Sequence, residues 1–381
     1  MNDAAVRTPR SYRIACAFFF FISGFGYSSW ASRIPSIKQQ LHLNEAQLGA
    51  VLFALPIGLM ATMPLTGWLL RKFSSRSIMM IGAVFYNLVI CLPGFTGYLW
   101  QLALVLLMFG SARNLLNIAT NAQGVEVQAL HTKSIMTSFH GIWSLAGFSG
   151  AALGYFMVKF NVAPGYHLLG VSIALLILSI YAYPKNLHQE PSREVKPLFS
   201  LPDKTLMRFA FITFASMACE NTMYDWSSIY FQNAVHGSKA AATAAFVIYM
   251  IAMTTGRFLG DKMVTRYGIK RLLNYSGICI FTGLMLAVLF PYEVTVDLGF
   301  IFVGFGVCCI VPLVYSLAGR SKTMSSATAL ASVSTIGYLG FLIVPPFVGF
   351  VAQLAGLRWS FGAIALLGGM VVWLVRGIKE E

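Results

Sequence analysis

Charged residues are scarce in this chain. Only 10% of its 381 residues are Asp, Glu, Lys or Arg, whereas a soluble domain carries about 25%. Hydrophobic residues make up 57% of the sequence, which leaves too few polar side chains to cover a globule in water. The composition excludes an ordinary soluble protein and indicates one whose main solvent is lipid.

Acidic residues are the rarer sign of charge, with 13 against 27 basic residues and a formal net charge of +14. Such a surplus can indicate nucleic-acid binding. Here the basic residues form short clusters between long apolar segments, as they do in the cytoplasmic loops of membrane proteins. We therefore interpret the charge as a topology signal and expect no nucleic-acid partner.

Motifs for nucleotide binding, hydrolysis and metal binding are missing from the sequence. It has no Gly-x-x-x-x-Gly-Lys-Ser/Thr loop, so ATP is not expected to drive the protein, and no HExxH or Gly-x-Ser-x-Gly motif. The six cysteines lie within apolar segments, without metal-type spacing. We expect the protein not to be an enzyme and to have no cofactor, no metal site and no disulfide.

Apolar segments of about 20 residues, the length of a helix that crosses a bilayer, recur along the whole chain. The period-two alternation of barrel strands does not occur. We predict an all-α membrane protein with twelve transmembrane helices, at residues 14–32, 48–70, 77–96, 99–123, 137–158, 166–183, 207–230, 242–261, 271–290, 298–318, 326–352 and 358–376.

The longest polar stretch, PKNLHQEPSREVKPLFSLPDK at 184–204, follows the sixth predicted helix. Its prolines and charges are typical of a linker. We divide the chain into an N-terminal six-helix bundle at 1–184, a cytoplasmic linker at 185–205 and a C-terminal six-helix bundle at 206–381. Because this arrangement puts most basic residues inside, we expect both termini in the cytoplasm and a monomer in the cell (inner) membrane.

Two loops resemble the loop signature of the major facilitator superfamily, a glycine and an acidic residue followed by basic residues. The better match, after the eighth predicted helix, contains Gly256, Arg257, Asp261 and Arg266. An acid at a helix end can pair with a base or with a neighbouring helix N-terminus, and so latch one conformation. The alternative is a plain topology signal, which is stronger for the poorer match after the second helix, Gly67 with Arg71.

Within that superfamily, four stretches resemble a bacterial subgroup close to the fucose permeases, often called YbjJ-like. They lie at residues 117–124, 139–144, 220–227 and 337–346. One departure is Asn117, where an aspartate is expected. The resemblance covers nearly the whole chain. It implies two six-helix bundles around a central cavity that opens alternately to the two sides of the membrane, lined by helices one, four, seven and ten.

Charged groups within predicted helices are costly in lipid and mark functional or paired positions. Glu220 belongs to one polar face of the seventh helix, which also carries Tyr224. It could carry a proton, bind substrate hydroxyls or amines, or form a structural ion pair. Asp225, closer to the outer surface, could be a gate or a plain surface residue.

The fourth predicted helix carries a second polar face with Arg113, Asn117 and Asn121. Arg113 could bind an anionic substrate, or pair with Glu126 or Glu220 as a structural link between helices. In the fifth helix, His140 could be a proton relay or a structural hydrogen bonder. Aromatic residues could stack against a cyclic solute or anchor helices at the membrane surface, namely Tyr27, Trp143 and Tyr338.

Together these features predict a secondary active transporter for a small polar, sugar-like solute, coupled to protons and working by alternating access. Protonation of Glu220 would bias the conformational equilibrium. The partners we expect are the solute, protons and the lipid bilayer. Two alternatives remain open: efflux of drugs or metabolites by proton antiport, and a sensor with the body of a transporter.

Overall fold

The computed structural model describes residues 8–131, 135–188, 202–203, 206–321, 324 and 326–378, and within these ranges all regular secondary structure is helical. The first half of the chain forms α1 (Pro9–Ala31), α2 (Ile34–Gln40), α3 (Glu45–Leu52), α4 (Ala54–Lys72), α5 (Ser75–Ile90), the 3₁₀ turn η1 (Leu92–Phe95), α6 (Leu99–Gln128), α7 (Met136–Lys159), α8 (Pro164–Ala182) and the 3₁₀ turn η2 (Tyr183–Lys185).

The second half forms α9 (Met207–Ala234), α10 (Lys239–Tyr267), α11 (Ile269–Leu289), α12 (Glu293–Val307), α13 (Ile310–Ala318), α14 (Ser326–Ala355) and α15 (Leu357–Arg376). The pairs α3/α4 and α12/α13 each make one span with a break in the middle. Most of the linker predicted at 185–205 lies outside the described residues.

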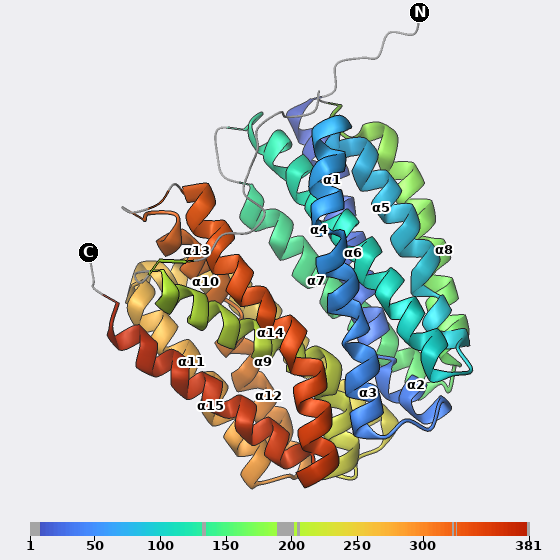
Figure 1. The fold of residues 1–381 in the computed structure, drawn as a ribbon, viewed down its shortest axis with the longest axis vertical. Coiled ribbons are helices and arrows are strands. Elements are labelled where there is room, and N and C mark those ends of the chain that lie inside the picture. Colours follow the sequence, from blue (N-terminus) through green and yellow to red (C-terminus); the bar gives the residue numbers. More distant parts are fainter. Residues whose placement is uncertain are drawn as a thin grey trace, which may run out of the picture.

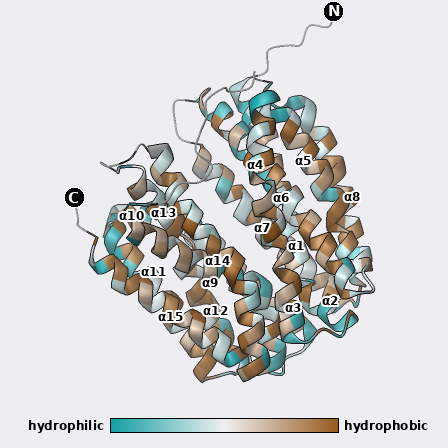
Figure 2. Ribbon diagram, in the orientation of Figure 1, coloured by the Kyte–Doolittle hydropathy of each residue, from teal (hydrophilic) through white to brown (hydrophobic). Residues whose placement is uncertain are grey.

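Eleven spans in the described chain are long and apolar enough to cross a membrane. The twelfth is α9, which is 28 residues long and more polar. Every residue of α9 from Ala215 to Phe231 is buried, so its neighbours shield it from lipid. The prediction of twelve membrane helices in two bundles is therefore confirmed. Figure 2 shows hydrophobic residues along the outer helices and hydrophilic ones gathered near the loops.

Local sequence sets where the helices begin. Pro9 and Pro164 stand in the first turns of α1 and α8, where a missing backbone N–H costs nothing. Asn44 caps α3 through a capping box with Gln47. The prediction placed residues 33–47 in a loop, but they hold α2 and the start of α3. The seven-residue helix α2 was missed because it is short and ends in polar residues.

The two bundles touch unevenly along their length (Figure 1). α7 packs along α10, and α14 packs closely on α3 but barely contacts α4, the continuation of the same span. The bundles are therefore closed at the end that holds α3 and apart at the end where α4 finishes. The described chain also begins and ends on the side where the bundles separate.

Glycines form the crossing of α3 and α14 at the closed end. A Cβ atom added to Gly49 would lie 2.5 Å from the carbonyl oxygen of Pro345, and one added to Gly349 would lie 2.6 Å from that of Glu45. Real Cβ atoms do not approach so closely, so the two helices can meet here only because both residues are glycine.

Polar contacts join the bundles at the same end. The Glu45 carboxylate accepts from Lys38 Nζ at 2.6 Å within its own bundle and from Asn233 Nδ2 at 2.9 Å in the other. Gln39 Nε2 donates to Gln232 Oε1 at 3.0 Å. These bonds link α2 and α3 of the first bundle to the end of α9 in the second.

Candidate functional site

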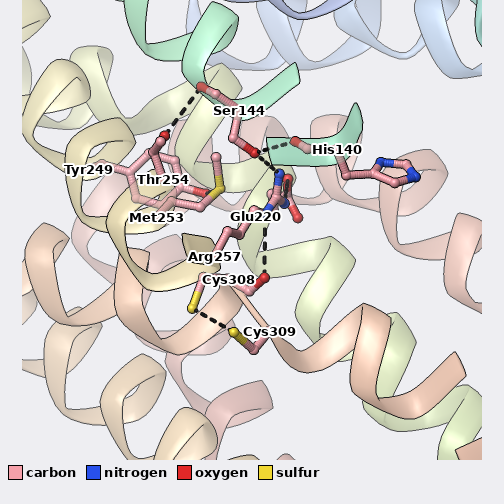
Figure 3. A network of polar contacts seen from close by, with 9 residues as sticks. All are labelled: His140, Ser144, Glu220, Tyr249, Met253, Thr254, Arg257, Cys308 and Cys309. Atoms are coloured by element: carbon pink, nitrogen blue, oxygen red, sulfur yellow. Dashed lines mark hydrogen bonds and ion pairs between the residues drawn. The ribbon is translucent and has the colours of Figure 1, made fainter. Parts of the chain in front are cut away.

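Polar side chains from both bundles meet where α7 of the first bundle packs on α10 of the second, which in turn packs on α9 (Figure 3). Glu220 of α9 pairs with Arg257 of α10, with 3.3 Å between Oε1 and Nη2. Arg257 Nη1 donates to Ser144 Oγ of α7 at 2.7 Å, and its Nε donates to the Cys308 carbonyl at 3.3 Å. An ion pair inside the second bundle is thus tied to the first bundle through Ser144.

Ser144 has contacts to both bundles. Its hydroxyl donates to the His140 carbonyl one turn earlier at 3.0 Å, while its own carbonyl accepts from Thr254 Oγ1 of α10 at 3.2 Å. Arg257 and Thr254 of α10 therefore both donate a hydrogen bond to this one residue of α7. We call Glu220, Arg257 and Ser144 the charge network.

A second line of contacts runs from the charge network into the first bundle. The Arg257 guanidinium lies 5.6 Å from the centre of the Trp143 ring. Trp143 Nε1 donates to Ser23 Oγ at 3.3 Å, and Ser23 Oγ donates to Asn117 Oδ1 at 2.6 Å. Asn121 instead bonds locally, to the carbonyl of Asn117 at 2.8 Å. The line connects α10 with α7, α1 and α6.

Aromatic rings bridge the bundles beside the charge network. The guanidinium of Arg113 on α6 lies 3.7 Å from the centre of the Tyr27 ring on α1. Tyr27 packs on Tyr224 of α9, in the other bundle, with 5.1 Å between ring centres. Tyr224 in turn contacts Phe246 and Tyr249 of α10, at 5.5 and 6.2 Å. A cation of the first bundle is thus stacked against an aromatic cluster that continues into the second.

The roles of Asp225 and Tyr338 were left open by the sequence, and the structure gives their surroundings. Asp225 is only 8% exposed and accepts from Asn221 Nδ2 at 3.0 Å, so it is not a plain surface residue. Tyr338 of α14 lies 6.4 Å from Phe341, centre to centre, and the preceding Gly337 packs on Thr213 and Met217 of α9. Asp225 and Tyr338 thus stay with the site.

Two expected pairings differ in the structure. Among the described residues Arg113 has no ion pair, either with Glu126 or with Glu220. Arg257 was expected near the inner end of the eighth helix, as part of the latch with Asp261. In the structure its guanidinium donates to Ser144 and Glu220. The side chain of Asp261 lies outside the described part of the structure, so its latch role stays a prediction.

The remaining predicted residues lie apart from the charge network. The ring of His140 packs edge-on against Phe20 at 5.5 Å and points away from Glu220 (Figure 3). Arg266 lies over the ring of the adjacent Tyr267 at 5.4 Å. Of the other predicted latch positions, Gly256 packs on Cys308. Gly67 and Arg71 lie near the end of α4.

Sequence reasoning missed the small polar members of the site. Ser23, Ser144, Asn221 and Thr254 are of types common in any membrane helix, and nothing in their spacing marks them. A signal existed for the ion pair: Arg257 and Glu220 are opposite charges within two predicted membrane helices, where charged groups usually have a partner. Among the described residues no group of three or more His, Cys, Asp or Glu side chains is placed to hold a metal ion.

Residues 16–334 match the family described as the Major Facilitator Superfamily. The chain is 31% identical over 367 residues to an uncharacterised MFS-type transporter of Yersinia pestis, with 96% of each chain covered. The chain therefore belongs to this superfamily of membrane transporters.

Two solved structures share the fold. The nucleoside transporter NupG superposes with a TM-score of 0.74 at 16% identity, covering 96% of this chain and 97% of the other. A bacterial homologue of the human lysosomal transporter Spinster, in an inward-facing and occupied conformation, gives 0.73 at 12% identity, with 98% and 97% covered. At these identities the likeness shows the architecture alone.

Proposed function

We propose that the protein is a secondary active transporter that moves a small polar, sugar-like solute by alternating access, coupled to protons. One observation carries the proposal: ionisable and aromatic groups of both bundles converge where α1, α6 and α7 face α9 and α10. Groups at such an interface change partners whenever the bundles rock. The resemblance to the YbjJ-like, fucose-permease-like subgroup supports the same substrate class.

The solute would lie against Tyr27 and Tyr224, one from each bundle, and so would bind both bundles at once. In the present conformation the α3–α14 crossing closes one end. Rocking would open that crossing and bring α4 onto α14 at the other end. The solute would then leave on the opposite side.

Glu220 would carry the coupled proton. Its carboxylate holds Arg257, and Arg257 donates the hydrogen bond that reaches Ser144 in the other bundle. Protonation would remove the charge that orients Arg257 and would weaken this contact between bundles. Proton occupancy and bundle position would thereby be linked.

The matching experiment replaces Glu220 by glutamine, which keeps the size and can still accept a hydrogen bond from Arg257. A thermal-shift screen of sugars, nucleosides, organic acids and drugs first identifies a solute. In proteoliposomes, Glu220→Gln is expected to bind that solute but to lose accumulation driven by a pH gradient. Glu293→Gln, the same change at an exposed position, should behave as wild type. Gradient-driven accumulation by Glu220→Gln would refute the proton role.

The remaining features of the proposal concern topology. We propose bundles at 1–184 and 206–381 joined by a cytoplasmic linker at 185–205, a monomer in the cell inner membrane, and an Asp261 latch on the cytoplasmic side. The basic residues near the helix ends support this orientation. A reporter that is fluorescent only in the cytoplasm, fused after Glu381, is expected to fluoresce, because the proposal puts the C-terminus there. If the fusion is made in normal amounts but does not fluoresce, the C-terminus lies outside the cytoplasm and the proposed orientation is reversed.

A further inference from the structure

Arg113 is a cation without a counter-ion in the described structure. The acids expected to pair with it contact other residues: Glu220 pairs with Arg257, and the Glu126 carboxylate accepts from Ser75 Oγ at 2.6 Å. A third acid of the second bundle, Asp225, accepts from Asn221 Nδ2 at 3.0 Å. Arg113 itself has no ion pair with any described residue, and its Nε is buried without a hydrogen-bond partner. Arg113 therefore forms no ion pair with the acids of the described structure.

The guanidinium is turned toward the second bundle. One face covers the ring of Tyr27 at 3.7 Å, and Tyr27 contacts Tyr224 across the bundle interface. Arg113 thus belongs to the same surface against which the solute is proposed to lie.

An unpaired charge away from water is unfavourable, and stacking on an aromatic face offsets only part of its cost. A planar guanidinium is suited to a carboxylate, which it can bind through two parallel hydrogen bonds. The second cation nearby, Arg257, is already balanced by Glu220. Because only one of these two arginines lacks an acid partner, a singly charged carboxylate fits better than a doubly charged phosphate.

Unpartnered hydroxyl groups lie along α9, the helix that carries Tyr224. Tyr224 Oη and Ser216 Oγ of α9 are buried without a hydrogen-bond partner among the described residues. Buried polar atoms in native proteins are nearly always satisfied. Hydroxyl groups of a bound solute would satisfy them, while the faces of Tyr27 and Tyr224 would cover its carbon skeleton.

We propose that the transported solute is a hydroxylated carboxylic acid whose carboxylate binds Arg113. This inference rests on the proposed transport function and narrows its substrate class. Arg113 is then a specificity-determining residue that distinguishes an acid from the neutral polyol of the same size.

The test uses three pairs of probes, each differing only in a carboxylate against a hydroxymethyl group: glucuronate and glucose, gluconate and sorbitol, lactate and propane-1,2-diol. The purified full-length protein is heated with each probe. At least one acid is expected to raise the melting temperature by about 5 °C when present at roughly 100 times its Kd, with its neutral partner giving less than a third of that shift.

Variants test whether the shift in melting temperature depends on Arg113. In Arg113→Gln the shift given by the acid should fall to that of the neutral partner, and Arg113→Lys should keep part of it. Arg271→Gln, which removes one exposed positive charge, should respond as wild type. Melting curves without probe confirm that each variant is folded. An acid shift that survives in Arg113→Gln, equal shifts within every pair, or no shift with any acid would each overturn the inference.

The outcomes also separate this inference from the proposed function. If a neutral probe binds and is accumulated in proteoliposomes under a pH gradient, the protein is a transporter and only the acid preference is wrong. If an acid binds through Arg113 but is never moved across the membrane, the binding site stands and the transport proposal fails.

Discussion

The variant Arg257→Gln is expected to be destabilised by about 3 kcal/mol, because it leaves the carboxylate of Glu220 largely buried and without its cation. The ion pair is mostly shielded from solvent, with 21% of the Arg257 side chain and 11% of the Glu220 side chain exposed. The same change removes the hydrogen bond to Ser144 of the other bundle. Equilibrium unfolding of the purified protein measures the loss.

A double variant separates charge from packing. Arg257→Gln combined with Glu220→Gln leaves no unpaired charge, and its stability is expected to lie much closer to wild type than that of Arg257→Gln alone. Arg271→Gln is the matched control at an exposed position. Equal destabilisation of the single and double variants would show that the charge pair is not what Arg257 contributes.

The variant Gly349→Leu is expected to reduce transport to background while each bundle still folds. A side chain there meets the backbone of Glu45 and Gly49 in the other bundle, so the α3–α14 crossing cannot form and the closed end stays open. A labelling reagent should therefore react with a cysteine at position 352 faster in this variant than in the parent, since Ala352 is buried one turn beyond Gly349 on α14. Uptake and labelling rates measure the two effects.

The control for this prediction is Gly170→Leu on α8, where an added Cβ atom meets nothing within 4 Å. It should leave transport and labelling as in the parent. A Gly349→Leu variant that transports at the parent rate would show that closing this crossing is not part of the cycle. A folded variant whose cysteine stays protected would mean that the crossing tolerates the larger side chain.

Sequence alone predicted the twelve helices and their approximate limits, because the thickness of a bilayer imposes one length on every span. Even α9, the most polar span, could be placed from its length and from its position after the linker. The short helix α2 was not predicted, since it lies outside the apolar segments, where no such length rule holds.

The site was predicted less completely. Glu220, Arg113 and Tyr27 could be chosen because each is unusual at its depth in a membrane helix. Their partners depend on the rotation of each helix about its axis, which a single sequence does not fix. Arg257 was expected in a latch near the inner end of the eighth helix, but α10 continues to Tyr267 and the Arg257 side chain pairs with Glu220.

The burial of α9 also bears on how the protein is made. A helix with Glu220 and Asp225 in its middle is a poor substrate for insertion into lipid by itself. α10 and α14, which cover it, are both synthesised later. The second half of the chain must therefore enter the bilayer cooperatively, with α9 retained near the insertion machinery until its later neighbours arrive.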